Sequence, residues 1–251
     1  MIGRWWTLWL LARKRLESPE SYRAFQCYQG RWLTERLQRL GVPLKDSLVL
    51  DLGAGLGGYS LALRSVGAEV VGLDLKPAAD LQSMGVDQVK GDALELPFRR
   101  SSFDGVFCAS LIEHVRDQGR LLLEMRRVLK PGGWAYLSFP PYFSPLGGHQ
   151  FSPFHYFGER IALAVTRRRR WWGTSSWVPA AFGTNPASFA DAFGAYGLYP
   201  VTIAKVRSLI KSSGFEIKWW GTRFFPVNVA RLPVLGEFLS WHVEFLLQPI
   251  R

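Results

Sequence analysis

The amino-acid sequence predicts an α/β fold: a doubly wound, mainly parallel, seven-stranded Rossmann-like sheet with a helical N-terminal cover and a lid insertion after the fifth strand. Two observations lead to this prediction. Short apolar runs, typical of strands buried on both faces, alternate with helical patterns along residues 47–139. A glycine-rich turn joins the first apolar run to a helical pattern. With 251 residues, 48% of them hydrophobic, the chain suffices for one α/β domain with insertions.

The N-terminal cover is expected over residues 1–40. Its first part, Met1–Arg15, places tryptophans and leucines between Arg4 and a basic cluster. The apolar stretch Trp5–Ala12 is too short to span a bilayer, which needs about 20 residues. Its composition is typical of a helix that lies in a membrane interface. Packing on the protein's own lid is the alternative, and both interpretations stay open here.

A second helix is expected over Ser18–Leu40. Ser18 suits the position that caps a helix, and Pro19 suits the first turn, where a missing N–H group costs nothing. Aromatic residues and leucines recur along this segment at helical spacing. This spacing predicts a helix with one buried face, and core packing is the favoured role for most of its aromatic side chains.

The first predicted strand, Leu48–Leu52, is apolar except for Asp51 near its end. Gly53, Gly55 and Gly58 follow it, in the G-x-G-x-x-G spacing that dinucleotide-binding proteins also use. A strand, a tight glycine turn and a helix N-terminus together place backbone N–H groups beside a ligand. A carboxylate next to the turn suits an ammonium group better than a pyrophosphate, because like charges repel. The turn therefore favours a ligand that carries an amino-acid moiety.

Four more strands are predicted before residue 140, at Glu69–Leu73, Gln88–Lys90, Ser102–Ala109 and Trp134–Phe139. Polar residues follow the first three of them. Asp74 ends the second strand of the sheet, in a place to accept hydrogen bonds from both ribose hydroxyls. Asp92 follows the third strand, and Ser110 follows the fourth. Parallel strands point their carboxyl ends to one edge of the sheet, so these residues are expected near one another.

In this order the five strands and their polar ends resemble the class I S-adenosylmethionine-dependent methyltransferases, nearest the branch of the quinone-biosynthesis C-methyltransferases. The resemblance is close over residues 48–139 and looser elsewhere. It implies S-adenosylmethionine as cofactor, with the methionine end at the glycine turn, the ribose at the second strand, the adenine at the second and third, and the sulfonium at the fourth. The cofactor-binding residues that it implies are Asp51, Gly53, Ala54, Gly55, Asp74, Leu75, Asp92, Ala93 and Ser110. An Asn/Asp-Pro-Pro-Tyr motif is missing, so methylation of adenine or glutamine amino groups is not indicated.

Residues 140–200 follow the cofactor-binding core, residues 41–139, and the resemblance implies that they form a substrate lid. His149 and His155 lie there among aromatic residues, and His114 follows the fourth strand. These three histidines are the candidate general bases for a hydroxyl acceptor, with a hydrogen-bonded packing role as the alternative for each. No metal site is expected, because no carboxylate–histidine spacing in the sequence supports one.

Residues 201–251 are expected to complete the sheet. A helix at Thr202–Ser213, capped by Thr202, precedes a sixth strand at Glu216–Trp220. Alternating apolar and polar side chains from Trp241 to Leu247 indicate the seventh strand, which the resemblance implies to be antiparallel. The segment between these two strands is expected to add an apolar flap or a short helix over the substrate opening.

The chain is strongly basic, with a net charge of +11, which implies an acidic partner. Arg167–Arg170, followed by Trp171 and Trp172, admits three interpretations: a solvated charge run, contact with anionic lipids or contact with a nucleic acid. The N-terminal segment favours the lipid over the nucleic acid. Cys27 and Cys108 form neither a metal spacing nor a disulfide framework, so a cytoplasmic location is expected, with peripheral attachment to the inner membrane face left open.

Together these features predict an enzyme that transfers the methyl group of S-adenosylmethionine to an oxygen or an activated carbon of a lipid-linked or amphipathic acceptor. One alternative is a soluble small-molecule or sugar O-methyltransferase. An RNA methyltransferase is less favoured, because no RNA-binding module is appended. A non-catalytic protein on the same fold is also less favoured, since Asp51, the glycines, Asp74 and Asp92 are all intact.

Overall fold

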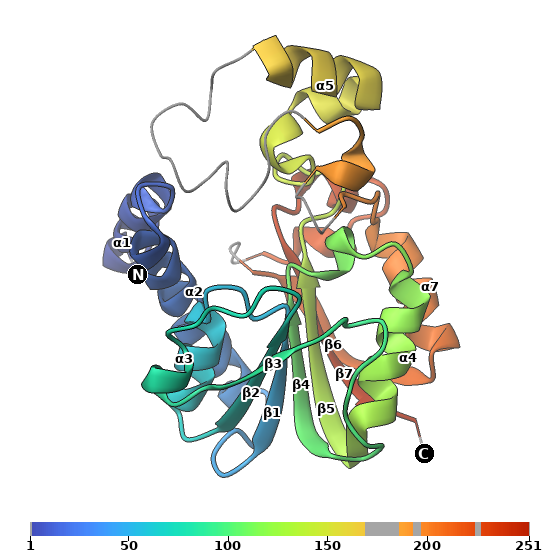
Figure 1. Ribbon diagram of the computed structural model, residues 1–251. Coiled ribbons are helices and arrows are strands. Elements are labelled where there is room, and N and C mark those ends of the chain that lie inside the picture. The colour runs from blue at the N-terminus through green and yellow to red at the C-terminus, as the bar shows by residue number, and fades with distance from the viewer. Residues whose placement is uncertain (1, 169–185, 193–196, 224–226, 251) are drawn as a thin grey trace.

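A computed structural model describes residues 2–168, 186–192, 197–223 and 227–250 of the chain. Within them lies a seven-stranded sheet in the order β3-β2-β1-β4-β5-β7-β6 (Figure 1). β7 runs antiparallel to both of its neighbours, and the other paired strands are parallel. The predicted fold class and the antiparallel seventh strand are confirmed. The strands are β1 Leu48–Leu52, β2 Glu69–Asp74, β3 Asp87–Lys90, β4 Phe103–Ala109, β5 Leu129–Phe139, β6 Phe215–Thr222 and β7 Val243–Pro249.

Helices cover both faces of this sheet (Figure 1). On one face, α2 and α3 share an apolar core with β1, β2 and β4. On the other face, α4 and α7 pack on a larger core that includes β4, β5 and β7. The described helices are α1 Ile2–Lys14, α2 Pro19–Arg39, α3 Gly58–Arg64, α4 Gln118–Val128, α5 Glu159–Arg168, α7 Ile203–Ser212 and α8 Leu235–Leu239, with 3₁₀ turns at Gln82–Met84, Ile112–His114, His149–Phe151, Phe154–Phe157, Phe189–Asp191 and Val229–Arg231.

Two helix caps form as the sequence predicts. The Ser18 hydroxyl accepts a hydrogen bond from the backbone N–H of Ser21 at 3.1 Å, at the start of α2. The Thr202 hydroxyl accepts one from the N–H of Lys205 at 3.2 Å, at the start of α7. Each bond satisfies an N–H group that has no partner within its helix.

The largest difference from a predicted strand boundary is at β5, which begins at Leu129 and not at the predicted Trp134, while the other strand ends differ from the predictions by at most two residues. Leu129 pairs with Phe103 and Trp134 pairs with Gly105, and the register shifts between these two pairs. The segment Lys130-Pro131-Gly132-Gly133 has a composition typical of turns. In the structure it forms an irregularity inside the strand and not a connection before it.

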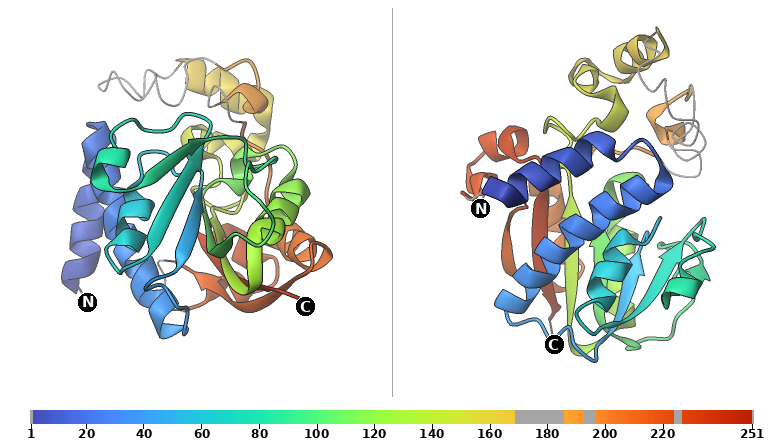
Figure 2. Two further views of the ribbon diagram at one scale, coloured as in Figure 1. Left: turned by 60° about the horizontal axis from the view of Figure 1, so that its bottom comes forward. Right: turned by 90° about the vertical axis from the view of Figure 1, so that its left-hand side faces the viewer.

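Helix α1 packs on α2 at the edge of the molecule (Figure 2). The ring of Trp5 meets the ring of Trp32 edge-on, with 5.3 Å between their centroids. Trp6 and Trp9 stack on each other and remain exposed. None of the described helices combines the length and the apolar character that crossing a bilayer requires.

The lid stands above the carboxyl edge of the sheet and has a small apolar core of its own (Figure 1). This core joins α5 to the 3₁₀ turns at His149–Phe151 and Phe189–Asp191 through Phe151, Leu163 and Phe189. The expected short helix between the last two strands is α8, and its Phe238 ring lies 5.6 Å from that of Phe143 in the lid. Three predicted features lie outside the described residues: the run from Arg169 to Trp172, most of the loop between Pro179 and Gly197, and Phe224-Phe225-Pro226.

Candidate active site

A pocket of about 190 Å³ opens at the carboxyl edge of the sheet. Five of the residues predicted to bind the cofactor line it: Gly53, Asp74, Leu75, Asp92 and Ala93. They come from the ends of β1, β2 and β3, as the parallel topology requires. Ala190, Gly197 and Tyr199 line the same pocket, so the lid insertion also borders this site.

The glycine turn between β1 and α3 forms the pocket's inner wall. Gly53 and Gly55 have φ angles of +71° and +53°, in the region that side chains other than glycine rarely adopt. A Cβ atom on Gly53 would also lie 3.0 Å from Cδ1 of Leu111. The N–H groups of Gly53 and Ala54 both donate to the carbonyl oxygen of Leu73, at 2.8 and 3.1 Å. These bonds hold the turn against the end of β2, beside Asp74.

Asp51 lies behind this turn, only 2% exposed. The Ser60 hydroxyl donates a hydrogen bond to its carboxylate at 2.5 Å. Burial raises the pKa of Asp51 to about 7, and the nearby Asp74 carboxylate acts in the same direction. A cationic group bound here would stabilise the ionised form of Asp51, so the site is suited to an ammonium group.

Asp74 and Asp92 are both held by backbone N–H donors at the pocket. Asp74 accepts hydrogen bonds from Gly55 at 2.9 Å and from Lys76 at 2.8 Å. Asp92 accepts one from Leu94 at 2.8 Å. An ionised carboxylate has about four acceptor positions, so both retain capacity for hydroxyl or amino donors of a ligand. A buried acid at the glycine turn, two fixed carboxylates and the apolar Leu75 together fit S-adenosylmethionine.

Ser110 ends β4 with a φ angle of +56°, which is uncommon for residues other than glycine. Its N–H group donates to the carbonyl oxygen of Ser138 on β5 at 2.8 Å. This bond turns the following 3₁₀ helix, Ile112–His114, toward the pocket, and His114 lines the pocket wall. Asp51, Ala54, Gly55 and Ser110 are not among the residues that line the pocket.

Two of the three candidate bases lie together at this edge. The rings of His114 and His149 are 4.9 Å apart, centroid to centroid. Nδ1 of His114 lies 2.8 Å from the carbonyl oxygen of Gly197, and Nε2 of His149 lies 3.9 Å from Oε1 of Glu113. Burial lowers the pKa of His114 to about 4 and that of His149 to about 3. Both imidazoles are therefore neutral at pH 7, and the same burial makes them weak proton acceptors.

Burial raises the pKa of Glu113 to about 8, whereas it lowers the pKa of the two histidines, because burial disfavours the charged form of each group. The third candidate base, His155, lies in the lid, where its Nε2 is 2.8 Å from the carbonyl oxygen of Tyr142. Burial lowers the pKa of His155 as well. The structure thus brings His114 and His149 together with Glu113, a residue that sequence reasoning did not select.

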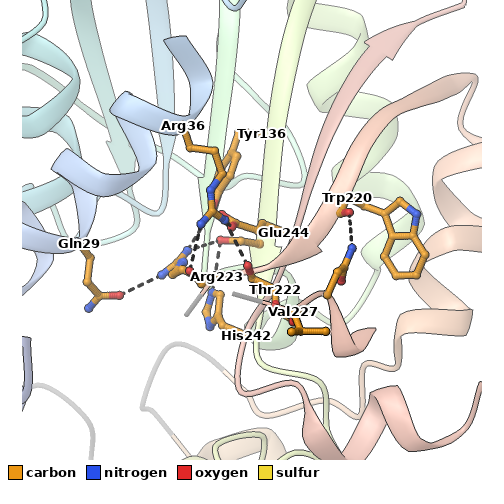
Figure 3. A network of polar contacts seen from close by, with 11 residues as sticks. Gln29, Arg36, Tyr136, Trp220, Thr222, Arg223, Val227, His242 and Glu244 are labelled. Atoms are coloured by element: carbon orange, nitrogen blue, oxygen red, sulfur yellow. Dashed lines mark hydrogen bonds and ion pairs between the residues drawn. The ribbon is translucent and has the colours of Figure 1, made fainter. Parts of the chain in front are cut away.

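Sequence reasoning also missed a buried arginine next to the site. The Arg223 side chain lies between the end of β6 and helix α2, 4% exposed (Figure 3). It donates hydrogen bonds to Gln29, Tyr59, Tyr136 and Ser138, at 3.1, 2.9, 3.2 and 2.6 Å. No sequence signal pointed to this arginine, because its partners come from three separate elements, α2, α3 and β5.

Glu244 on β7 completes this network (Figure 3). It accepts a 2.6 Å hydrogen bond from the Tyr136 hydroxyl and pairs with Arg36 of α2. The alternation along this strand suggested one polar face, but β7 lies between β5 and β6 and Glu244 is fully buried. The charged residue within an internal strand could have indicated this network from the sequence, since a buried charge must be paired.

Comparisons with known proteins agree with this geometry. A family model described as a methyltransferase domain matches residues 50–137. An uncharacterized methyltransferase of Mycobacteroides abscessus is 30% identical over 223 residues, which cover 84% of this chain and 80% of that protein. Its name gives the reaction class and no acceptor.

Two solved structures share the fold. An S-adenosylmethionine-dependent methyltransferase of Thermotoga maritima, described as a possible histamine N-methyltransferase, superposes with a TM-score of 0.57 at 18% identity, covering 96% of this chain and 99% of that one. The 1,6-didemethyltoxoflavin-N1-methyltransferase of Burkholderia thailandensis, with its substrate and S-adenosylhomocysteine bound, gives 0.54 at 16% identity, covering 90% and 79%. At these identities the likeness concerns the fold alone.

Proposed function

Because the chain belongs to the class I S-adenosylmethionine-dependent methyltransferases, we propose that it methylates an oxygen or an activated carbon of a lipid-linked or amphipathic acceptor. S-adenosylmethionine supplies the electrophilic methyl group on its sulfonium. The protein's part is to hold the acceptor in line with that group and to exclude water. A quinone-like, polyprenyl or glycolipid compound has the required combination of a nucleophilic head and an apolar tail.

The observation that carries this proposal is an exposed apolar rim at the carboxyl edge of the sheet. Large apolar side chains of the lid and of the α8 region are exposed to solvent there. They are Phe143, Leu146, Tyr156, Phe157, Ile161, Leu235, Phe238, Leu239 and Trp241. The contact between Phe143 and Phe238 joins the two groups. Contiguous exposed apolar surface marks a site of contact with a ligand, a protein or a membrane.

Helix α1 supports access from a membrane surface. Trp6 and Trp9 are 59% and 45% exposed. The Arg13 guanidinium lies 4.8 Å from the centre of the Trp9 ring, and Arg13 and Lys14 form the helix's basic last turn. Exposed tryptophans next to basic residues are typical of helices that lie in an interface with anionic lipids. We infer peripheral contact with the inner membrane face through this helix.

The polar groups beside the pocket suit the reactive head of such an acceptor. The neutral imidazoles of His114 and His149 can each accept a hydrogen bond from a hydroxyl group, and they remain the candidate bases of this proposal. The apolar tail would leave along the exposed rim. This division of polar interior and apolar opening favours an amphipathic acceptor over a fully water-soluble one.

The test is methyl transfer from S-adenosylmethionine with a radiolabelled methyl group into an extract of the producing organism, followed by partition between organic solvent and water. The proposal expects label in the organic phase, and none with the Asp74→Ala variant. Label confined to small molecules in the aqueous phase would favour the soluble O-methyltransferase, and label in RNA would favour the RNA methyltransferase. Either result would overturn the proposed acceptor class and leave the reaction class intact.

A further inference from the structure

Three side chains with metal-ligating atoms gather where the loop after β4 meets the lid. Glu113 and His114 come from the 3₁₀ helix at Ile112–His114, and His149 comes from the 3₁₀ helix at His149–Phe151. One carboxylate oxygen and one ring nitrogen from each histidine lie within 4.8 Å of one another. No spacing within the sequence signals this group, because the third ligand comes from a separate segment.

Glu113 has a feature that its surroundings do not explain. The residue is 2% exposed, and neither of its carboxylate oxygens makes a hydrogen bond to a described residue. The backbone of Glu113 itself and the positive charge of Arg223 act to lower the pKa of this carboxyl group, but burial outweighs both. A buried carboxyl group without hydrogen bonds costs free energy, and a bound cation is one of the partners that resolve such a case.

His114 is already oriented as metal-binding histidines usually are. Its Nδ1 lies 2.8 Å from the carbonyl oxygen of Gly197, a pure acceptor. Nδ1 must therefore carry the proton in that bond, which leaves the lone pair on Nε2. A backbone carbonyl in this position is a common second partner of zinc-binding histidines, because it fixes both the ring orientation and the tautomer.

We propose that Glu113, His114 and His149 bind one divalent transition-metal ion. Two imidazoles and a carboxylate suit zinc, cobalt or iron(II), whereas magnesium and calcium prefer oxygen ligands. Metal–ligand bonds of about 2.0–2.2 Å in a tetrahedral site place the ligand atoms about 3.3–3.6 Å apart. Nε2 of His149 and Oε1 of Glu113 are 3.9 Å apart, so small side-chain movements close the site.

Binding would have two structural consequences. His149 belongs to the lid and Glu113 to the loop after β4, so the ion would hold the lid on the core. With the ion bound, His114 and His149 would be its ligands and would no longer serve as bases for the acceptor. Three protein ligands leave a fourth position open, as catalytic zinc sites do. His114 lines the cofactor pocket, which places this position near an oxygen atom of the acceptor. The identity of that fourth ligand rests on the proposed function, and binding of the ion itself does not.

The experiment uses the tag-free protein after treatment with a chelator. Cobalt(II) is titrated by visible absorption and zinc(II) by calorimetry. The expected result is one ion per chain with a dissociation constant of micromolar or lower and a cobalt spectrum typical of four-coordinate geometry. Glu113→Gln and His149→Ala should each weaken binding on the order of 100-fold, since each removes a ligand. His155→Gln is the matched control, expected to bind like the wild type, because His155 is held by the Tyr142 carbonyl.

Saturating zinc should also raise the melting temperature of the wild type, and it should have little effect on Glu113→Gln. Absence of stoichiometric binding to the wild type, or equal binding by the wild type and both ligand variants, would overturn the inference. Titration of each sample with S-adenosylhomocysteine, without metal, shows whether the variants are folded. That titration also separates failure of this inference from failure of the cofactor assignment.

Discussion

The hydroxyl of Ser60 donates a 2.5 Å hydrogen bond to the carboxylate of Asp51, behind the glycine turn. Burial raises the pKa of this carboxyl group from its ordinary value of 3.8 to about 7. This buried acid behind the glycine turn therefore changes charge near neutral pH. The ionisation of Asp51 therefore makes both the cofactor affinity and the stability of the protein depend on pH, in opposite directions.

Cofactor affinity is predicted to rise with pH. Between pH 5.5 and 7.0 the ionised fraction of Asp51 increases on the order of tenfold for a pKa of about 7, and only the ionised form pairs with the ligand's ammonium group. Calorimetric titration with S-adenosylhomocysteine should show a matching gain in affinity. Asp51→Asn should bind more weakly and with little dependence on pH. An equally steep dependence in that variant would assign the effect to another group.

The stability of the cofactor-free protein is predicted to fall as pH rises. A carboxyl group whose pKa is raised on folding stabilises the folded state fully below its ordinary pKa of 3.8, and this contribution is lost as pH rises through about 7. Asp51→Asn cannot ionise. Its free energy of unfolding, measured with guanidinium chloride, should therefore fall less than that of the wild type between pH 5 and 8. A larger fall in the variant would contradict the assignment.

Glu244→Gln is predicted to destabilise the protein by about 3 kcal/mol, because breaking a buried ion pair leaves an uncompensated charge. Glu244 is fully buried between Tyr136 and Arg36. The control is Glu216→Gln, which breaks an exposed pair with Lys218 and should cost less than about 1 kcal/mol. Chemical denaturation measures both. Equal costs for the two variants would show that the buried network does not hold α2 to the sheet.

Replacing Trp6 and Trp9 by alanine is predicted to abolish sedimentation with anionic vesicles and to leave the melting temperature almost unchanged. Both side chains are exposed, while Trp5 makes the contact with Trp32. Leu123→Ala on α4 is the control, since it removes an exposed apolar side chain from the other face of the sheet (Figure 1). Unchanged sedimentation of the double variant would remove the support that α1 gives to membrane access.

The fold and the meeting of Asp74 and Asp92 at one pocket were predictable from the sequence, because both follow from local patterns. Leu48–Leu52 and Glu69–Leu73 show the apolar runs of buried parallel strands, and Asp74 and Asp92 stand where such strands end. Each of these features lies within a few residues of the chain. Parallel topology then places their ends at one edge without further information.

The polar interior was not predictable in the same way. Arg223 donates hydrogen bonds to side chains of α2, α3 and β5. No spacing within the sequence indicates that these side chains meet. Glu113 meets His149 only because the lid folds back on the loop after β4. His155 also lies among aromatic residues of the lid, yet its ring turns to the Tyr142 carbonyl. Long-range packing decides between these two histidines.

The most direct test of the account is calorimetric titration of the wild type and Asp74→Ala with S-adenosylhomocysteine. Asp74 lines the pocket and is held there by the N–H groups of Gly55 and Lys76. The account predicts micromolar binding to the wild type and a loss of at least about tenfold in the variant, the effect of about 1.4 kcal/mol expected when a charged hydrogen-bond partner is removed. Asp87→Ala, at an exposed position on β3, should bind like the wild type. No binding to the wild type, or equal binding to all three proteins, would contradict the cofactor site described for this pocket.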